Sequence, residues 1–162
     1  MKPFKTVGIQ YAALPYRLEG RRVEVMLITS RRTRRWIIPK GWPMPGLKPQ
    51  EAAAVEATEE AGILGEIGER PVGSYHYLKA RKGDETQAIQ VLVFPLRVAD
   101  QVPAFKEEGQ RTFKWFAYEE AARLVNEPSL KRIIRDFGGS LAPNPLVKAF
   151  RRYWSWRFGA QL

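Results

Sequence analysis

Short apolar stretches separated by polar turns dominate the first part of the chain. Residues 6–16, 22–30 and 36–39 are rich in valine, isoleucine, leucine and aromatic residues, and polar or glycine-containing turns lie between them. Short runs of such residues bounded by turns are typical of β-strands. The pattern therefore predicts several strands before any helix.

The pattern changes at Pro49, where an alanine-rich segment begins. A proline is tolerated in the first turn of a helix, and here Glu51 follows it in that turn. Gly62 provides a position at which a helix can end. We therefore expect a helix that begins at Pro49 and stops at Gly62.

The second half of the chain alternates between the same two patterns. Residues 62–73 are rich in turn formers, and the segments after them predict strands at 74–80, 86–98 and 111–118, a helix over 119–125 and another helix after Pro128. One face of that last helix is apolar and consists of Leu130, Ile133, Ile134 and Phe137. Gly138 and Gly139 separate it from a basic, aromatic tail.

The order of these elements indicates the fold class. Three strands, a helix, three strands and two helices favour mixed β-sheets sandwiched with helices, in an α/β or α+β fold. A length of 162 residues fits one compact domain, which we expect over residues 1–140. Residues 141–162 predict an additional amphipathic helix that packs on the domain or on a second subunit, so a homodimer is one expectation.

Composition excludes several kinds of site and partner. The chain has no cysteine and one histidine, His76, which rules out disulfide scaffolds, thiolate sites and multi-histidine metal sites. No apolar run approaches the roughly 18 residues that cross a bilayer, and the N-terminal segment lacks the features of a signal peptide. We therefore expect a cytoplasmic protein without integral membrane association. The net charge of +10 favours a polyanionic partner, either nucleic acid, an anionic membrane surface or a phosphate-rich small molecule.

The charge inverts locally within the predicted helix. Residues 51–60 contain four glutamates and no lysine or arginine, and helical spacing places Glu56, Glu59 and Glu60 on one face. Like charges at this spacing repel by about 0.2–0.5 kcal/mol per pair, so an external cation should neutralise them. Clustered oxygen ligands suit Mg²⁺ or Mn²⁺. The alternative is an acidic helix face exposed to solvent.

The residues around this helix resemble the Nudix box of the MutT-like Nudix hydrolases. The box is written as Gly, five residues, Glu, seven residues, then Arg-Glu, an apolar residue, any residue, Glu-Glu, any residue, Gly and an apolar residue. The chain matches it at Gly41, Glu56, Glu59, Glu60, Gly62 and Ile63. The resemblance extends over about residues 5–137 and implies the Nudix fold.

The resemblance also implies the chemistry. Nudix hydrolases use Mg²⁺ or Mn²⁺ and water to cleave a diphosphate linkage. Glu56, Glu59 and Glu60 would accordingly be the catalytic, metal-binding residues, together with the main-chain carbonyl of Lys40 or Gly41. The general base in this family is often a glutamate outside the box, which leaves as candidates Glu56, Glu85, Glu107 and Glu108.

A basic segment directly before the box predicts the contacts to substrate. The groups that would bind the anionic parts of a phosphate-rich small molecule are Arg31, Arg32, Arg34, Arg35 and the side chain of Lys40. An exposed turn with incidental charge is the alternative for the arginines. The Pro-Lys-Gly turn and the arginines before it resemble the branch of diadenosine-polyphosphate and diphosphoinositol-polyphosphate hydrolases, which implies one of those polyphosphates as the substrate.

Two departures from the box keep other functions open. Leu47 stands where the first Glu usually is, and Val55 stands where an arginine holds the carboxylates of Nudix proteins. Because less cationic charge surrounds the carboxylates, these departures predict weak hydrolytic activity. The alternative is a non-catalytic module that binds a nucleotide or polyphosphate. A basic nucleic-acid-binding protein is the other alternative, but nucleic acid is disfavoured because the acidic helix face would repel it.

Overall fold

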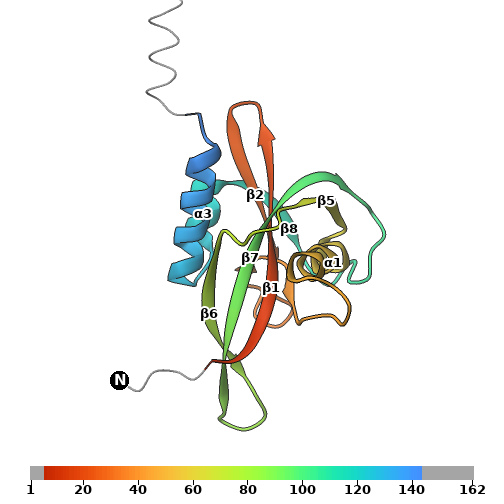
Figure 1. Cartoon of the computed structure of the whole chain (residues 1–162), viewed down its shortest axis with the longest axis vertical. Helices are drawn as coiled ribbons and strands as arrows, with labels where there is room; N and C mark the ends of the chain where they lie inside the picture. Colours follow the sequence, from red (N-terminus) through yellow and green to blue (C-terminus); the bar gives the residue numbers. More distant parts are fainter. Residues whose placement is uncertain (1–5, 144–162) are drawn as a thin grey trace, which may run out of the picture.

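The computed structural model describes residues 6–143, which form a mixed α/β fold (Figure 1). The strands are β1 (Thr6–Glu19), β2 (Arg22–Thr29), β3 (Trp36–Ile37), β4 (Lys40–Gly41), β5 (Ile63–Ile67), β6 (Gly73–Ala80), β7 (Thr86–Gln101) and β8 (Phe113–Ala117). The helices are α1 (Pro49–Ala61), α2 (Tyr118–Leu124) and α3 (Pro128–Leu141). This arrangement confirms the predicted fold class.

A pair of parallel strands lies at the centre of the sheet. β1 and β7 run side by side, with Tyr11 opposite Leu92. All other pairings are antiparallel: β2 and β4 pair with β1, β3 and β8 pair with β2, and β5 and β6 pair with β7. The result is one 8-stranded mixed sheet whose main path follows the order β3-β2-β1-β7-β5.

Successive residues of the central strands supply two cores, one on each face of the sheet. Ala13 and Met26 belong to the core that α1 covers, whereas Ala12 and Val25 belong to the core that α2 and α3 cover. α1 and α3 accordingly lie on opposite sides of the sheet (Figure 1). The sheet is therefore sandwiched between helices, as the order of elements predicts.

The predicted helix over the acidic segment is confirmed as α1. The carboxylate of Glu51 accepts a hydrogen bond from the main-chain N–H of Lys48 at 2.8 Å and so caps the first turn. Gly62 ends the helix with a left-handed φ of 67°. Between these ends, Ala53, Ala57 and Ala61 are fully buried against the sheet, and their small side chains allow a close approach.

Three predictions of local structure are wrong. Residues 62–73 include strand β5, because Ile63–Ile67 pair with the end of β7. Of the strand predicted at 36–39, only Trp36–Ile37 form a strand, β3, while β4 begins beyond it at Lys40 and pairs with a different neighbour. Gly138 and Gly139 do not end α3, which continues to Leu141, and a Cβ at Gly138 would overlap the ring of Tyr118. Glycine at 138 thus lets the helix pass close to that ring.

The apolar face predicted for the last helix is confirmed, since Leu130, Ile133 and Ile134 are buried in α3 and Phe137 packs beside them. Of the tail predicted as a helix, residues 144–162 lie outside the described residues. Within residues 6–143, the helices lack the length and apolar character needed to span a bilayer.

Candidate active site

Two glycines allow neighbouring segments to lie close to α1. A Cβ at Gly41 would overlap the carboxylate of Glu56, so glycine lets strand β4 lie against the helix. A Cβ at Gly62 would overlap the carbonyl oxygen of Val102, in the loop that follows β7. These close approaches explain the first and last glycines of the motif.

Glu60 is the most buried glutamate of α1, with 7% of its surface exposed. Its Oε2 accepts a hydrogen bond from the main-chain N–H of Lys40 at 3.2 Å, and its Oε1 accepts one from Arg111 at 2.7 Å. Burial raises the pKa of Glu60 to about 7, although the positive charges of Arg111 and Lys40 oppose that rise. Glu60 therefore gains or loses its charge close to neutral pH.

Glu56 and Glu59 are half-buried on the same helix. The carboxylate of Glu59 pairs with the ammonium group of Lys106 at 3.2 Å, whereas Glu56 makes no ion pair with any residue in the described part of the chain. Burial, with the negative charges of Glu59 and Glu107, raises the pKa of Glu56. An unpaired carboxylate in this environment is stabilised by a cation.

The loop between β7 and β8 brings Glu107 to the same place. Its main-chain N–H donates to the carbonyl oxygen of Glu59 at 2.9 Å. Its side chain pairs with Arg111 at 2.8 Å and with Arg31 at 3.2 Å. Glu56, Glu59, Glu60 and Glu107 are called the carboxylate cluster below.

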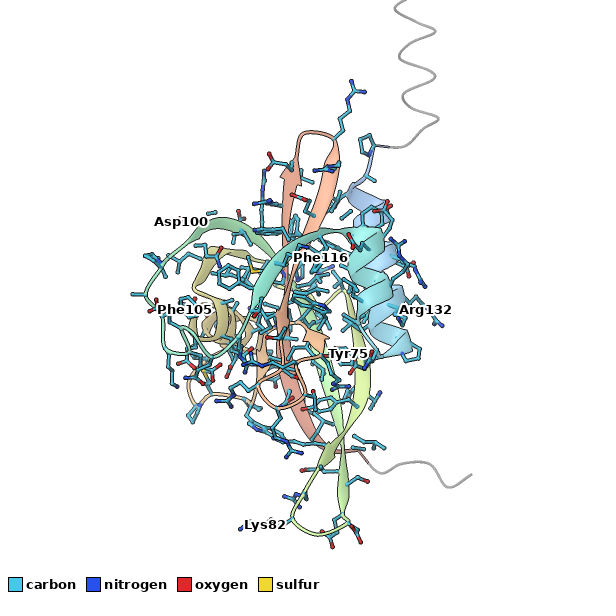
Figure 2. The ribbon with its side chains drawn as sticks, turned by 180° about the vertical axis from the view of Figure 1, so that it is seen from behind. Tyr75, Lys82, Asp100, Phe105, Phe116 and Arg132 are labelled. Carbon is cyan, nitrogen blue, oxygen red and sulfur yellow. The ribbon has the colours of Figure 1, made fainter. Side chains whose placement is uncertain are left out.

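The other two candidates for the general base lie elsewhere. Glu85 belongs to the turn between β6 and β7, close to Lys82 at the tip of the hairpin in Figure 2, while Phe105 marks the loop beside α1. Glu108 is exposed. Among the glutamates outside the box that the sequence offers for this role, Glu107 is the one placed against α1.

The carboxylate cluster provides oxygen ligands but is not a complete metal cage. Within the described residues, no three or more acidic or histidine side chains converge as a ready ligand set. Glu59 and Glu60 are instead engaged with Lys106 and Arg111. The donors at hand are carboxylate oxygens and the main chain at Lys40 and Gly41. Such a set fits a hard divalent cation that keeps several waters, such as Mg²⁺.

The arginines predicted to bind substrate lie in the exposed turn between β2 and β3. Arg31 pairs with Glu107, Arg34 donates to the carbonyl oxygen of Gln110 at 3.2 Å, and Arg35 lies 3.8 Å from a carboxylate oxygen of Glu127. Arg32 makes no ion pair in the described residues. The turn thus contributes positive charge beside the cluster, while three of its arginines also hold neighbouring segments.

Lys40 lies beside the cluster and over an aromatic ring. Its Nζ is 5.1 Å from the ring centroid of Tyr77, whose hydroxyl donates to Gln10 at 2.7 Å. Burial lowers the pKa of Lys40, while the negative charges of Glu60 and Glu127 act in the opposite direction. A half-buried ammonium group of this kind gains stability from an anionic ligand.

Sequence reasoning missed the cations that neutralise the carboxylate cluster. The helix has no basic residue of its own, as the sequence shows, but Lys106 and Arg111 reach Glu59 and Glu60 from a loop distant in sequence. The one available signal is the position of Arg111, at the start of the strand predicted at 111–118. That signal does not show which strand lies next to the box.

The fold and the site together define the class of protein. An 8-stranded mixed sheet lies between helices, and a glutamate-bearing helix follows a glycine loop on one face. Residues 9–137 match the profile of the family described as NUDIX domain. The chain therefore belongs to the Nudix family, as the resemblance predicts.

Relatives of known family agree with this assignment. The chain is 26% identical over 119 residues to the mitochondrial Nudix hydrolase 12 of Arabidopsis thaliana, covering 72% of this chain and 59% of that protein. It is 33% identical over 117 residues to diphosphoinositol polyphosphate phosphohydrolase 3-alpha of Mus musculus, covering 70% of this chain and 66% of that protein. Because the plant relative is named as mitochondrial, a cytoplasmic location for this chain stays a prediction.

A solved structure shares the fold. The binary complex of the Ap4A hydrolase of C. elegans superposes with a TM-score of 0.62 at 24% identity, covering 84% of this chain and 98% of that one. The similarity supports the sandwich of sheet and helices described above.

Proposed function

We propose that the chain is a Mg²⁺- or Mn²⁺-dependent hydrolase that cleaves a diphosphate linkage by attack of water on phosphorus. The observation that carries this proposal is the buried Glu60 beside the unpaired Glu56 on a Nudix-type helix, with Glu107 facing them from another loop. Glu56 is the carboxylate of this group without an ion pair in the described residues, and a divalent cation of the kind used in phosphoryl chemistry would stabilise its charge.

Each residue of the cluster has a role in this proposal. Glu56, Glu59 and Glu60 hold the metal with the main-chain carbonyl of Lys40 or Gly41. When bound, the ion neutralises charge on the phosphate oxygens and acidifies water. Glu56 is the favoured general base because its pKa is raised and no cation among residues 6–143 pairs with it, whereas Glu107 is held by Arg111 and Arg31.

The surrounding charge supports a polyphosphate substrate. Lys40 is half-buried beside Glu60, and the arginine turn of residues 31–35 reaches Glu107 through Arg31. Guanidinium and ammonium groups placed in this way bind several phosphates at once. We therefore favour a dinucleoside polyphosphate or a diphosphoinositol polyphosphate, in which Arg32 and Lys40 contact the phosphates that are not cleaved.

Product release from a substrate panel tests the proposal. The panel contains a diadenosine polyphosphate, a diphosphoinositol polyphosphate, a nucleoside triphosphate and ADP-ribose, each with Mg²⁺, with Mn²⁺ and with a chelator. Glu56→Gln should reduce turnover by about 10²–10³-fold. Glu51→Gln is the matched control on the same helix, because glutamine preserves the cap at Lys48.

The outcomes separate the alternatives. Hydrolysis confined to triphosphates or ADP-ribose would refute the substrate class, and activity that survives in Glu56→Gln would refute the site. Tight binding without product would assign the chain as a non-catalytic polyphosphate-binding module. Salt-dependent retention on nucleic acid without any hydrolysis would assign it as a nucleic-acid-binding protein.

A further inference from the structure

Val55 leaves the motif helix without a basic residue of its own. Residues 51–60 carry four glutamates and no lysine or arginine. The side chain at 55 lies four residues before Glu59, close enough on the helix for an arginine to pair with that carboxylate. Here that position is aliphatic, so any cation that orients Glu60 has to come from another element.

Arg111 reaches Glu60 from the loop directly before β8. Its Nη2 lies 2.7 Å from Oε1 of Glu60, its Nε lies 2.8 Å from Oε2 of Glu107, and its Nη1 donates to the carbonyl oxygen of Thr29 at 3.1 Å. All three guanidinium nitrogens are therefore engaged within the chain. The side chain is 7% exposed, which leaves it no freedom to move toward a ligand without breaking these contacts.

The backbone around Arg111 is fixed as firmly as its side chain. The N–H of Thr112 donates to the hydroxyl of Thr29 at 2.9 Å, and the N–H of Thr29 donates to the carbonyl oxygen of Thr112 at 2.9 Å. β8 then continues in antiparallel pairing with β2, with Phe113 opposite Ile28. Arg111 is thus anchored to the sheet while Glu60 belongs to α1.

We propose that Arg111 replaces the arginine missing at position 55 and positions Glu60 and Glu107 as one unit. It is a positioning residue, since its nitrogens contact protein oxygens only. The inference rests on the proposed metal-dependent function of the cluster. It explains how a box without its arginine keeps the carboxylates in place.

Relocating the arginine tests the proposal. Arg111→Met should lower kcat by about 10–100-fold with little change in KM, because the carboxylates lose orientation while substrate contacts remain. Arg111→Lys should fall in between, since an ammonium group cannot bridge Glu60, Glu107 and Thr29 in the same planar geometry. Adding Val55→Arg to Arg111→Met should recover about tenfold in kcat, whereas Val55→Arg alone should change it little.

A control and an activity-independent measurement accompany the kinetics. Arg17→Met removes a guanidinium that pairs with Glu24 at 2.9 Å, on the β1–β2 hairpin, and should leave kcat unchanged. Denaturant unfolding of the metal-free Arg111→Met, Glu60→Gln and double variants should show a coupling of about tenfold in the unfolding equilibrium constant.

The results separate failure of this inference from failure of the proposed function. Normal kcat in Arg111→Met, or no recovery on adding Val55→Arg to a folded Arg111→Met protein, would overturn the replacement. If Arg111→Met does not fold, Arg111→Lys with and without Val55→Arg gives the same comparison. If the wild-type chain hydrolyses nothing, the proposed function fails. Independently of activity, additive changes in the free energy of unfolding for Arg111→Met and Glu60→Gln would overturn the link between Arg111 and Glu60.

Discussion

The two faces of the sheet are covered by helices that are held in different ways. α1 packs through small residues such as Ala53 and Ala57, and its glutamates are fixed by ion pairs and by close backbone contacts at Gly41 and Gly62. α3 packs through large aliphatic side chains, Leu130, Ile133 and Ile134. We therefore expect substitutions on the α1 face to affect mainly catalytic activity, and substitutions on the α3 face to affect mainly the stability of the fold.

The largest effect is expected from Glu60→Gln on the α1 face. The variant keeps the shape of the side chain but removes the buried charge to which Arg111 and the main-chain N–H of Lys40 donate hydrogen bonds. We expect a loss of about 10³-fold in kcat with the fold retained. Steady-state kinetics and the circular dichroism of the same sample check this, and a loss below about tenfold would contradict it.

The opposite behaviour is expected from Leu130→Ala on the α3 face. Leu130 is fully buried, and truncation should lower the free energy of unfolding by about 2–5 kcal/mol. Turnover per folded molecule should stay unchanged. Denaturant titration combined with kinetics below the unfolding transition checks both parts, and reduced turnover in fully folded protein would contradict the division between faces.

Two glycine substitutions sharpen the same contrast. In Gly41→Ala the new Cβ displaces the carboxylate of Glu56, so activity should fall by about 10²-fold with a small change in stability. In Gly138→Ala the new Cβ displaces the ring of Tyr118, so stability should fall by about 1–3 kcal/mol with activity retained. Measuring kcat and the unfolding midpoint for both variants tests the pair, and equal losses of activity would argue against it.

The smallest effect concerns pH. Because burial raises the pKa of Glu60 to about 7 from an ordinary 4.5, the folded protein binds a proton there more tightly than the unfolded chain does. The stability of the metal-free protein should therefore decline as pH rises between these values. Its affinity for Mg²⁺ should rise with pH through about 7, because the carboxylate must lose its proton to bind the ion. Denaturant unfolding and Mg²⁺ titrations at several pH values check both directions, and Glu60→Gln should flatten the pH dependence of stability.

Local signals in the sequence predicted the parts of the site that depend on local structure. The helix at Pro49–Ala61 and its end at Gly62 follow from a proline in the first turn, an alanine-rich body and a glycine stop. The shared face of the glutamates follows from helical spacing. The family assignment follows because the box residues lie close together in sequence.

Contacts between distant segments could not be predicted in this way. Arg111 pairs with Glu60 across 51 positions, and contacts between distant segments, such as the pairing of β8 with β2 and the bond from Glu107 to Glu59, bring them together. β5 could not be predicted from its own sequence, which is rich in turn-forming residues. It becomes a strand because it forms hydrogen bonds with the end of β7. In both cases the deciding interaction is tertiary.

The parallel pairing of β1 with β7 has a consequence for the order of folding. Tyr11 meets Leu92 only after the intervening chain, which includes all of α1, has closed into a long loop. Closing such loops makes non-local sheets slow to form.

The same topology determines when the site is assembled. β4, which carries Lys40 and Gly41, pairs with β1, and the segment with Glu107 and Arg111 follows β7. The halves of the site therefore meet late, when the central strands have joined, and a nascent chain that carries the complete glutamate helix has no assembled site until then.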